Sequence, residues 1–128
     1  MRSPISPINL AQVCAAPDTA LAGGAHPHPE TVAEIVTYRL QGGADPQAHL
    51  AAARQTMPFL RSTGAVINRT LSRDDTGLWT DHILWTSLKA AKQTEALAMQ
   101  RPEFNTFFSM IDETGLTLGH ALVMLQMD

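Results

Sequence analysis

The sequence predicts an α+β domain whose elements follow one another in the order β-α-β-β-α-β. Three observations lead to this prediction. The chain has 128 residues, a length typical of a single domain. Strand-like and helical patterns alternate over residues 31–128, and one pair of predicted strands is joined by a short loop ending in glycine. No internal repeat or low-complexity tract interrupts this order.

The first 30 residues differ in composition from the rest of the chain. They contain five of the eight prolines and the only cysteine, and they have no aromatic residue. Because proline fixes φ and removes an amide donor, regular structure is not expected here. Prolines and polar residues also interrupt the apolar core that an export signal requires. We predict a proline-rich N-terminal arm over residues 1–30, either loose or laid across a partner subunit.

The domain begins with a strand and a helix. Residues 31–40 are rich in β-branched and aromatic side chains, which favour a strand. After a turn, Asp45 is expected to cap a helix that has Pro46 at its first position. Apolar residues then recur at helical spacing at Leu50, Ala53, Met57 and Leu60. We expect Pro58 to kink or shorten this helix and Gly64 to end it.

A hairpin and a second helix are predicted next. Residues 65–73 and 78–86 have strand-like patterns, and residues 74–77 (DDTG) between them favour a tight connection. Ser87 is placed to cap the helix that follows, since its side chain can accept from a free backbone N–H. Pro102 is expected to break this helix.

The last part of the domain is predicted to contain a short helical piece and a strand. The helical piece carries four large apolar residues, Phe104, Phe107, Phe108 and Ile111. Thr114 and Gly115 are expected to turn the chain into a final strand over residues 116–127. The complete order, with a four-stranded antiparallel sheet, is the ferredoxin-like split arrangement.

The predicted strands are largely apolar on both faces. In the last strand, Leu118 and Leu122 flank His120 on one face, while Ala121 and Val123 lie on the other. A sheet with helices on one side would normally be polar on its second face. We therefore expect this second face to be covered by another copy of the chain, giving a homodimer. Cover by the N-terminal arm of the same chain is the alternative.

The composition excludes several classes of partner. The chain has 9 Lys and Arg against 12 Asp and Glu, and the formal net charge of −3 is unsuited to a phosphate backbone. We expect no nucleic-acid partner. Apolar runs are far shorter than the ~20 residues that span a membrane, so no membrane partner is expected either. The single Cys14 allows no intrachain disulfide, and we predict a soluble cytoplasmic protein.

Four segments together resemble a known family. A strand reading EIVTYRL, a hairpin ending in GLWTDHILW, a helix starting SLKAAKQ and the break RPEFNTFF are similar to the antibiotic biosynthesis monooxygenase-like family. The resemblance covers residues 31–128 and implies a dimeric α+β barrel. The family includes cofactor-free oxygenases of aromatic polyketides and haem-degrading enzymes. The haem-degrading members pair an Asn on the first strand with a Trp and a His, whereas residues 31–40 contain no Asn.

Asp81 is the first candidate catalytic residue. It lies between Trp79 and Trp85 on one face of a predicted strand. A carboxyl group in such a poorly hydrated site has a raised pKa and can act as a general base. The alternative is a structural ion pair with Arg69 or Arg39.

Two histidines are further catalytic candidates. His82 points to the face opposite Asp81, and His120 lies in mid-strand among leucines. Because imidazole titrates near neutral pH, either histidine could shuttle a proton. The alternative for each is a hydrogen-bonded packing residue.

Aromatic side chains suggest a ligand pocket. We predict that the ligand-binding residues are Trp79, Trp85, Tyr38, Arg69 and Phe108. Packing of these aromatic residues in the core is the alternative.

No cofactor and no metal site are predicted. The chain has no phosphate loop, dinucleotide fingerprint, nucleophile elbow or zinc-protease helix. The run from His26 to Pro29 offers two histidines without a nearby carboxylate cluster, which makes a weak site. Cys14 has no basic or histidine neighbour to lower its pKa.

The sequence therefore leaves two functions open. One is a cofactor-independent monooxygenase or isomerase that acts on a small aromatic or enolisable metabolite. The alternative is a non-catalytic dimeric protein that binds a small ligand or serves as an accessory protein. A cavity of ~300 Å³ or more beside Asp81, His82 or His120 would favour the enzyme.

Overall fold

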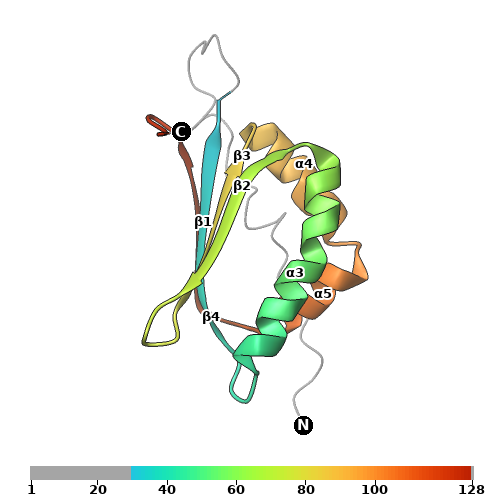
Figure 1. Cartoon of the computed structure of the whole chain (residues 1–128), viewed down its shortest axis with the longest axis vertical. Helices are drawn as coiled ribbons and strands as arrows, with labels where there is room; N and C mark the ends of the chain where they lie inside the picture. The colour runs from blue at the N-terminus through green and yellow to red at the C-terminus, as the bar shows by residue number, and fades with distance from the viewer. Residues whose placement is uncertain (1–29, 128) are drawn as a thin grey trace.

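The computed structural model describes residues 30–127, so the predicted arm over residues 1–30 lies almost wholly outside the described part of the chain (Figure 1). The elements are, in chain order, β1 (Val32–Leu40), α3 (Pro46–Thr63), β2 (Val66–Arg73), β3 (Trp79–Trp85), α4 (Leu88–Ala98), α5 (Pro102–Ser109) and β4 (Ile111–Leu122). The four strands form one antiparallel sheet in the order β2-β3-β1-β4. All three helices lie on the same side of this sheet. The predicted α+β, ferredoxin-like fold is confirmed.

The predicted helix caps are confirmed. The Asp45 side chain accepts from the backbone N–H of Gln47 at 3.1 Å, and the Ser87 side chain accepts from that of Ala90 at 3.0 Å. Gly64 ends α3 with φ at 70°, in the left-handed region that glycine enters without a steric penalty.

Of the two expected effects of Pro58, a kink or a shortening of the first helix, the shortening is not found, because α3 continues past Pro58 to Thr63. Proline removes one hydrogen bond to the carbonyl four residues earlier, that of Arg54. Both residues are exposed, so water can satisfy this carbonyl. The buried side of α3 keeps its packing through Ala53, Thr56 and Leu60, and this packing outweighs the single lost bond.

The predicted bounds of the last strand are also wrong. β4 begins at Ile111, which was placed in the preceding helix, and it ends at Leu122 rather than at residue 127. Thr114 and Gly115 do not turn the chain. The register between β1 and β4 shifts between Thr37 and Arg39, and Gly115 has φ at 80°. Glycine here marks an irregularity within a strand, which lets the strand bend while it stays paired.

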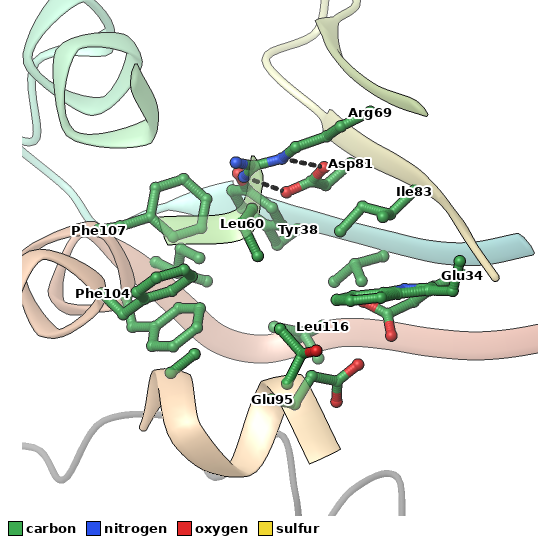
Figure 2. A pocket seen from close by; sticks show the side chains of 16 residues that line it. Glu34, Tyr38, Leu60, Arg69, Asp81, Ile83, Glu95, Phe104, Phe107 and Leu116 are labelled. Atoms are coloured by element: carbon green, nitrogen blue, oxygen red, sulfur yellow. Dashed lines mark hydrogen bonds and ion pairs between the residues drawn. The ribbon is translucent and has the colours of Figure 1, made fainter. Parts of the chain in front are cut away.

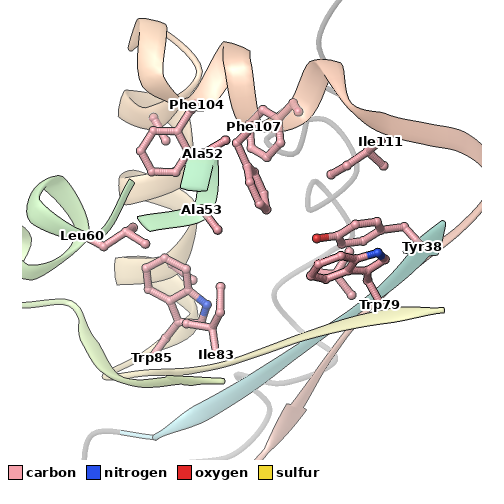
Figure 3. Packing of buried hydrophobic residues seen from close by; sticks show 14 of the residues in the cluster. Tyr38, Ala52, Ala53, Leu60, Trp79, Ile83, Trp85, Phe104, Phe107 and Ile111 are labelled. Carbon is pink, nitrogen blue, oxygen red and sulfur yellow. The ribbon is translucent and has the colours of Figure 1, made fainter. Parts of the chain in front are cut away.

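The core lies between the sheet and the helices. Alternation along β1 and β3 turns Val36, Tyr38, Trp79 and Trp85 toward the helices, as Figure 3 shows for the last three. The three phenylalanines of α5, Phe104, Phe107 and Phe108, pack into the same cluster.

The other face of the sheet has no helix over it. The strand register places Ala33, Ile35 and Thr37 of β1 there, flanked by His82 and Leu84 of β3. Ile35 is 41% exposed on this face, whereas Thr70 and Ser72 of β2 also lie there, so within the described chain the face is less apolar than predicted. No helix within residues 30–127 is both long and apolar enough to cross a membrane.

Candidate functional site

A cavity opens on the helix-covered face of the sheet (Figure 2). Its walls come from β1, β2, β3 and β4 on one side and from all three helices on the other. Most of the wall is apolar, with Leu60, Ile83, Ala98, Phe104 and Leu116 among its members. The cavity has a volume of about 50 Å³. This volume does not reach the ~300 Å³ set above as favouring an enzyme, and a bicyclic ligand would require movement of the lining side chains.

Asp81 lies at the cavity in a two-pronged ion pair with Arg69. Arg69 Nε donates to Asp81 Oδ1 at 3.0 Å, and Nη2 donates to Oδ2 at 2.7 Å (Figure 2). Both side chains are more than nine-tenths buried. Burial opposes the charge of Arg69, but the hydrogen bonds and charge of Asp81 outweigh burial and raise the pKa of the guanidinium. The ion-pair alternative for Asp81 is thus the arrangement in the structure.

Arg69 is held in place by further contacts. Its Nη1 donates to Thr56 Oγ1 of α3 at 2.8 Å, and its guanidinium carbon lies 5.4 Å from the centre of the Phe107 ring. The head group therefore joins β2, β3, α3 and α5 at one wall of the cavity. Such a two-pronged pair fixes both position and orientation of the guanidinium.

A second polar group consists of Glu34 on β1, Glu95 on α4 and His120 on β4. His120 Nε2 lies 2.9 Å from Glu34 Oε1. Figure 2 shows the carboxyl groups of Glu34 and Glu95 near each other at the cavity. Burial alone would raise the pKa of Glu34, but hydrogen bonds with His120 and Glu95 and the charge of Arg69 hold it below its usual value.

Tyr38 and His49 form a third buried pair beside the cavity. The Tyr38 hydroxyl lies 2.7 Å from His49 Nε2, while His49 Nδ1 has no hydrogen-bond partner within residues 30–127. The imidazole packs against Trp79 and is stacked on Phe107. Burial, and then the charge of Arg69, lowers the pKa of His49 to about 4. Burial raises the pKa of Tyr38 well above its ordinary value, so the hydroxyl keeps its proton.

The structure brings most of the predicted site residues together. Asp81 and four of the five predicted ligand-binding residues line the cavity, namely Tyr38, Trp85, Arg69 and Phe108. His120 does not line the cavity itself, but it contacts Glu34, which does. Trp79 does not line the cavity. Its ring lies parallel to that of Tyr38 within the core. His82 lies on the uncovered face of the sheet. The roles of all these residues stay predictions.

Sequence reasoning missed Glu34, Glu95 and His49. A signal for Glu34 is present, since period-2 alternation puts it on the same face of the first strand as Val32, Val36 and Tyr38. No comparable pattern pairs Glu95 with Glu34. Their proximity depends on how α4 lies on the sheet, which single-sequence periodicity does not specify.

The fold and the cavity define a class: small α+β proteins with a four-stranded antiparallel sheet, helices on one face and a cavity between them. No family model and no curated protein matches the chain, whereas solved structures do. SnoaB from Streptomyces nogalater, a cofactor-independent oxygenase, is 14% identical; the match covers 77% of this chain and 96% of SnoaB, with a TM-score of 0.54.

Two other solved structures are similar. A Caulobacter crescentus protein, provisionally assigned as an antibiotic biosynthesis monooxygenase, is 12% identical over 76% of this chain and 92% of that chain, with a TM-score of 0.60. A nipsnap family protein of unknown function from Agrobacterium tumefaciens is 21% identical over 77% of this chain and 92% of that chain, with a TM-score of 0.55. The likeness is one of fold. It agrees with the ferredoxin-like α+β fold that the family resemblance implied, while the dimer stays a prediction.

Proposed function

We propose that this protein is an oxygenase or isomerase that acts on a small aromatic or enolisable metabolite. The observation that carries the proposal is the cavity on the helix-covered face, whose wall is mostly apolar but holds the buried Arg69–Asp81 pair. An apolar cavity with a few fixed polar groups is typical of a small-molecule site. The fold shared with SnoaB, a cofactor-independent oxygenase, adds support.

Arg69 is the proposed source of electrostatic stabilisation. An enolate or phenolate that binds in the cavity carries a negative charge, and a fixed positive charge at the cavity wall lowers the energy of that anion. Asp81 and Thr56 hold the guanidinium so that it needs no reorganisation during the reaction. Asp81 is therefore proposed as the residue that positions Arg69. Tyr38, Trp85 and Phe108 would contact the flat part of the substrate.

A non-catalytic ligand-binding protein is the second candidate. The observation that favours it is that both oxygens of Asp81 already accept from Arg69, so this carboxylate is not placed as an unpaired base. A ligand would then fill the cavity without being converted.

Incubation of the purified protein with a metabolite extract separates the two functions. Untargeted mass spectrometry would follow compounds that decline with time and products that appear. An enzyme consumes a compound catalytically, whereas a binding protein only retains one. Products that form solely in the presence of air identify an oxygenase, and products that form equally without air identify an isomerase.

Two variants test whether the cavity is the site. Leu116→Trp should fill the cavity and abolish turnover or retention, since Leu116 lines it. Leu97→Trp is the matched control, because Leu97 is 55% exposed on α4 and does not line the cavity. Equal turnover or retention by the two variants would refute the cavity as the site.

We further propose that the protein is a cytoplasmic homodimer. The uncovered face of the sheet supports the dimer, since its middle presents the apolar side chains of Ala33, Ile35 and Leu84 beside Thr37, Thr80 and His82, and Arg39 lies only at the end of β1. Burial of this face against the same face of a second copy would remove its apolar side chains from water. A single cysteine, typical of proteins that rely on no disulfide, supports the cytoplasmic location.

A further inference from the structure

Three side chains able to ligate a metal meet at one end of the cavity. They are Glu34 from β1, Glu95 from α4 and His120 from β4, and one ligand atom of each lies within 4.8 Å of the other two. Glu34 and Glu95 are 2% and 4% exposed, and the His120 side chain is 11% exposed. The set offers two carboxylate oxygens and one imidazole nitrogen in a largely dry place.

The charges of this group are unequal. Two carboxylates meet one imidazole, with His120 Nε2 2.9 Å from Glu34 Oε1. The buried guanidinium of Arg69 already donates to both oxygens of Asp81. A cation at the three ligand atoms would compensate the carboxylate charge directly.

A second observation points to a ligand at this place. The indole nitrogen of Trp85 has no hydrogen-bond partner within residues 30–127, although the side chain is only 1% exposed. Trp85 lines the same cavity as Glu34 and Glu95, and Figure 3 shows its nitrogen on the side of the ring that faces Tyr38 across the cluster. Trp85 pairs with Val32 across the sheet, so it lies next to Glu34 on the same face. An indole N–H can only donate, so it calls for an acceptor such as metal-bound water.

We propose that Glu34, Glu95 and His120 bind one divalent first-row transition-metal ion. The donor set selects this class, because imidazole suits zinc, iron and their neighbours, whereas magnesium and calcium prefer oxygen alone. Ligand bonds of ~2.0–2.2 Å place neighbouring ligand atoms ~3–3.5 Å apart, which rotation of these side chains can reach. The inference goes beyond the proposed function and does not rest on it.

Three protein ligands leave coordination positions open, as in catalytic metal sites. Glu34 and Glu95 both line the cavity, so these positions would face it. The ion would also be within reach of an oxygen atom of any molecule that enters the cavity.

Metal titration of the full chain tests the proposal. Protein freed of metal with a chelator is titrated with Zn²⁺ by calorimetry and with Co²⁺ by visible absorption. One ion per chain should bind to the wild type, and Co²⁺ should give a ligand-field band. Glu95→Gln and His120→Gln should each weaken Zn²⁺ binding at least tenfold and reduce this band.

Matched controls keep the result specific. Glu103→Gln removes an exposed glutamate paired with Arg101, and His82→Gln removes the histidine of the uncovered sheet face, and both should bind as the wild type does. A His26→Gln/His28→Gln variant should also bind normally. The proposal is overturned if the wild type binds no tighter than the Glu95 and His120 variants, or if affinity is lost with His26 and His28. Circular dichroism confirms that each variant is folded.

Because the titration needs no substrate, its outcome is separate from that of the proposed function. Normal metal binding without turnover would support the metal site and refute the proposed enzymatic function. Turnover by protein that binds no metal would support the enzymatic function and refute the metal site.

Discussion

At the scale of single residues, the buried Arg69–Asp81 pair decides how one predicted site residue must be understood. The sequence predicts Asp81 as a carboxylate in an aromatic environment, and the side chain is indeed buried. Its two hydrogen bonds from Arg69 change its role, because a carboxylate whose two oxygens both accept from one guanidinium fixes the position of that guanidinium. The same pair makes a clear prediction about stability.

Replacing Asp81 alone should be costly, whereas replacing both partners should not. Asp81→Leu leaves the buried guanidinium of Arg69 without its counter-charge, which we expect to lower the free energy of unfolding by about 3–5 kcal/mol. The double variant Arg69→Met/Asp81→Leu should recover most of this loss. Urea unfolding of the three proteins measures the effect. A loss below ~1 kcal/mol in the single variant would contradict the prediction.

His49 should make stability depend on pH. Its pKa of about 4 in the folded protein lies below the ordinary 6.5, so the unfolded chain binds a proton more readily between these values. The contribution of His49 is fully present above pH 6.5 and falls as the pH drops toward 4. At ~1.4 kcal/mol per pKa unit, the loss is about 3 kcal/mol.

Two variants isolate this effect from that of the carboxylates. His49→Phe should flatten the dependence of unfolding free energy on pH between 6.5 and 4, whatever its effect on stability at neutral pH. Leu97→Phe, at an exposed position of α4 and without a titratable group, should leave the slope as in the wild type. Equal slopes for the wild type and His49→Phe would show that His49 is not held neutral.

At the scale of elements, local signals were reliable where a residue satisfies the backbone nearby. Asp45, Ser87 and Gly64 cap helices as predicted, because each capping interaction spans only two or three residues. The signals at Pro58 and Gly115 were misleading for the opposite reason. Packing of α3 and pairing of β4 with β1 involve distant parts of the chain, and these contacts overrule the local preference.

A side chain at Gly115 should therefore destabilise the fold, although Gly115 does not form a turn. With φ at 80°, Gly115→Ala puts a Cβ into the left-handed region and should cost about 1 kcal/mol. Gly42→Ala is the control, since Gly42 has no positive φ and no atom within 4 Å of a built Cβ. Thermal unfolding measures both. A cost at Gly42 as large as at Gly115 would rule out backbone strain as the cause.

At the scale of the whole molecule, the uncovered sheet face makes the proposed dimer testable. A dimer would have a mass of about 28 kDa, twice 13.9 kDa. Ile35→Lys places a charge in the middle of this face and should yield the 13.9 kDa species in light scattering. Leu97→Lys, on α4 and away from this face, should keep the wild-type mass. A monomeric wild type would refute the dimer.

The sequence by itself determined the order of the elements, the helix caps and the faces of the strands, because these depend on periodicity and on contacts a few residues long. From the alternation in β3 it placed Asp81 beside Trp79 and Trp85, and it held the same signal for Glu34. Only the tertiary structure decided which polar groups meet. Arg69 with Asp81, Tyr38 with His49, and Glu34 with Glu95 and His120 join residues from different elements. These pairings depend on how helices pack on a sheet, and their charges acquire a role only once burial removes water from them.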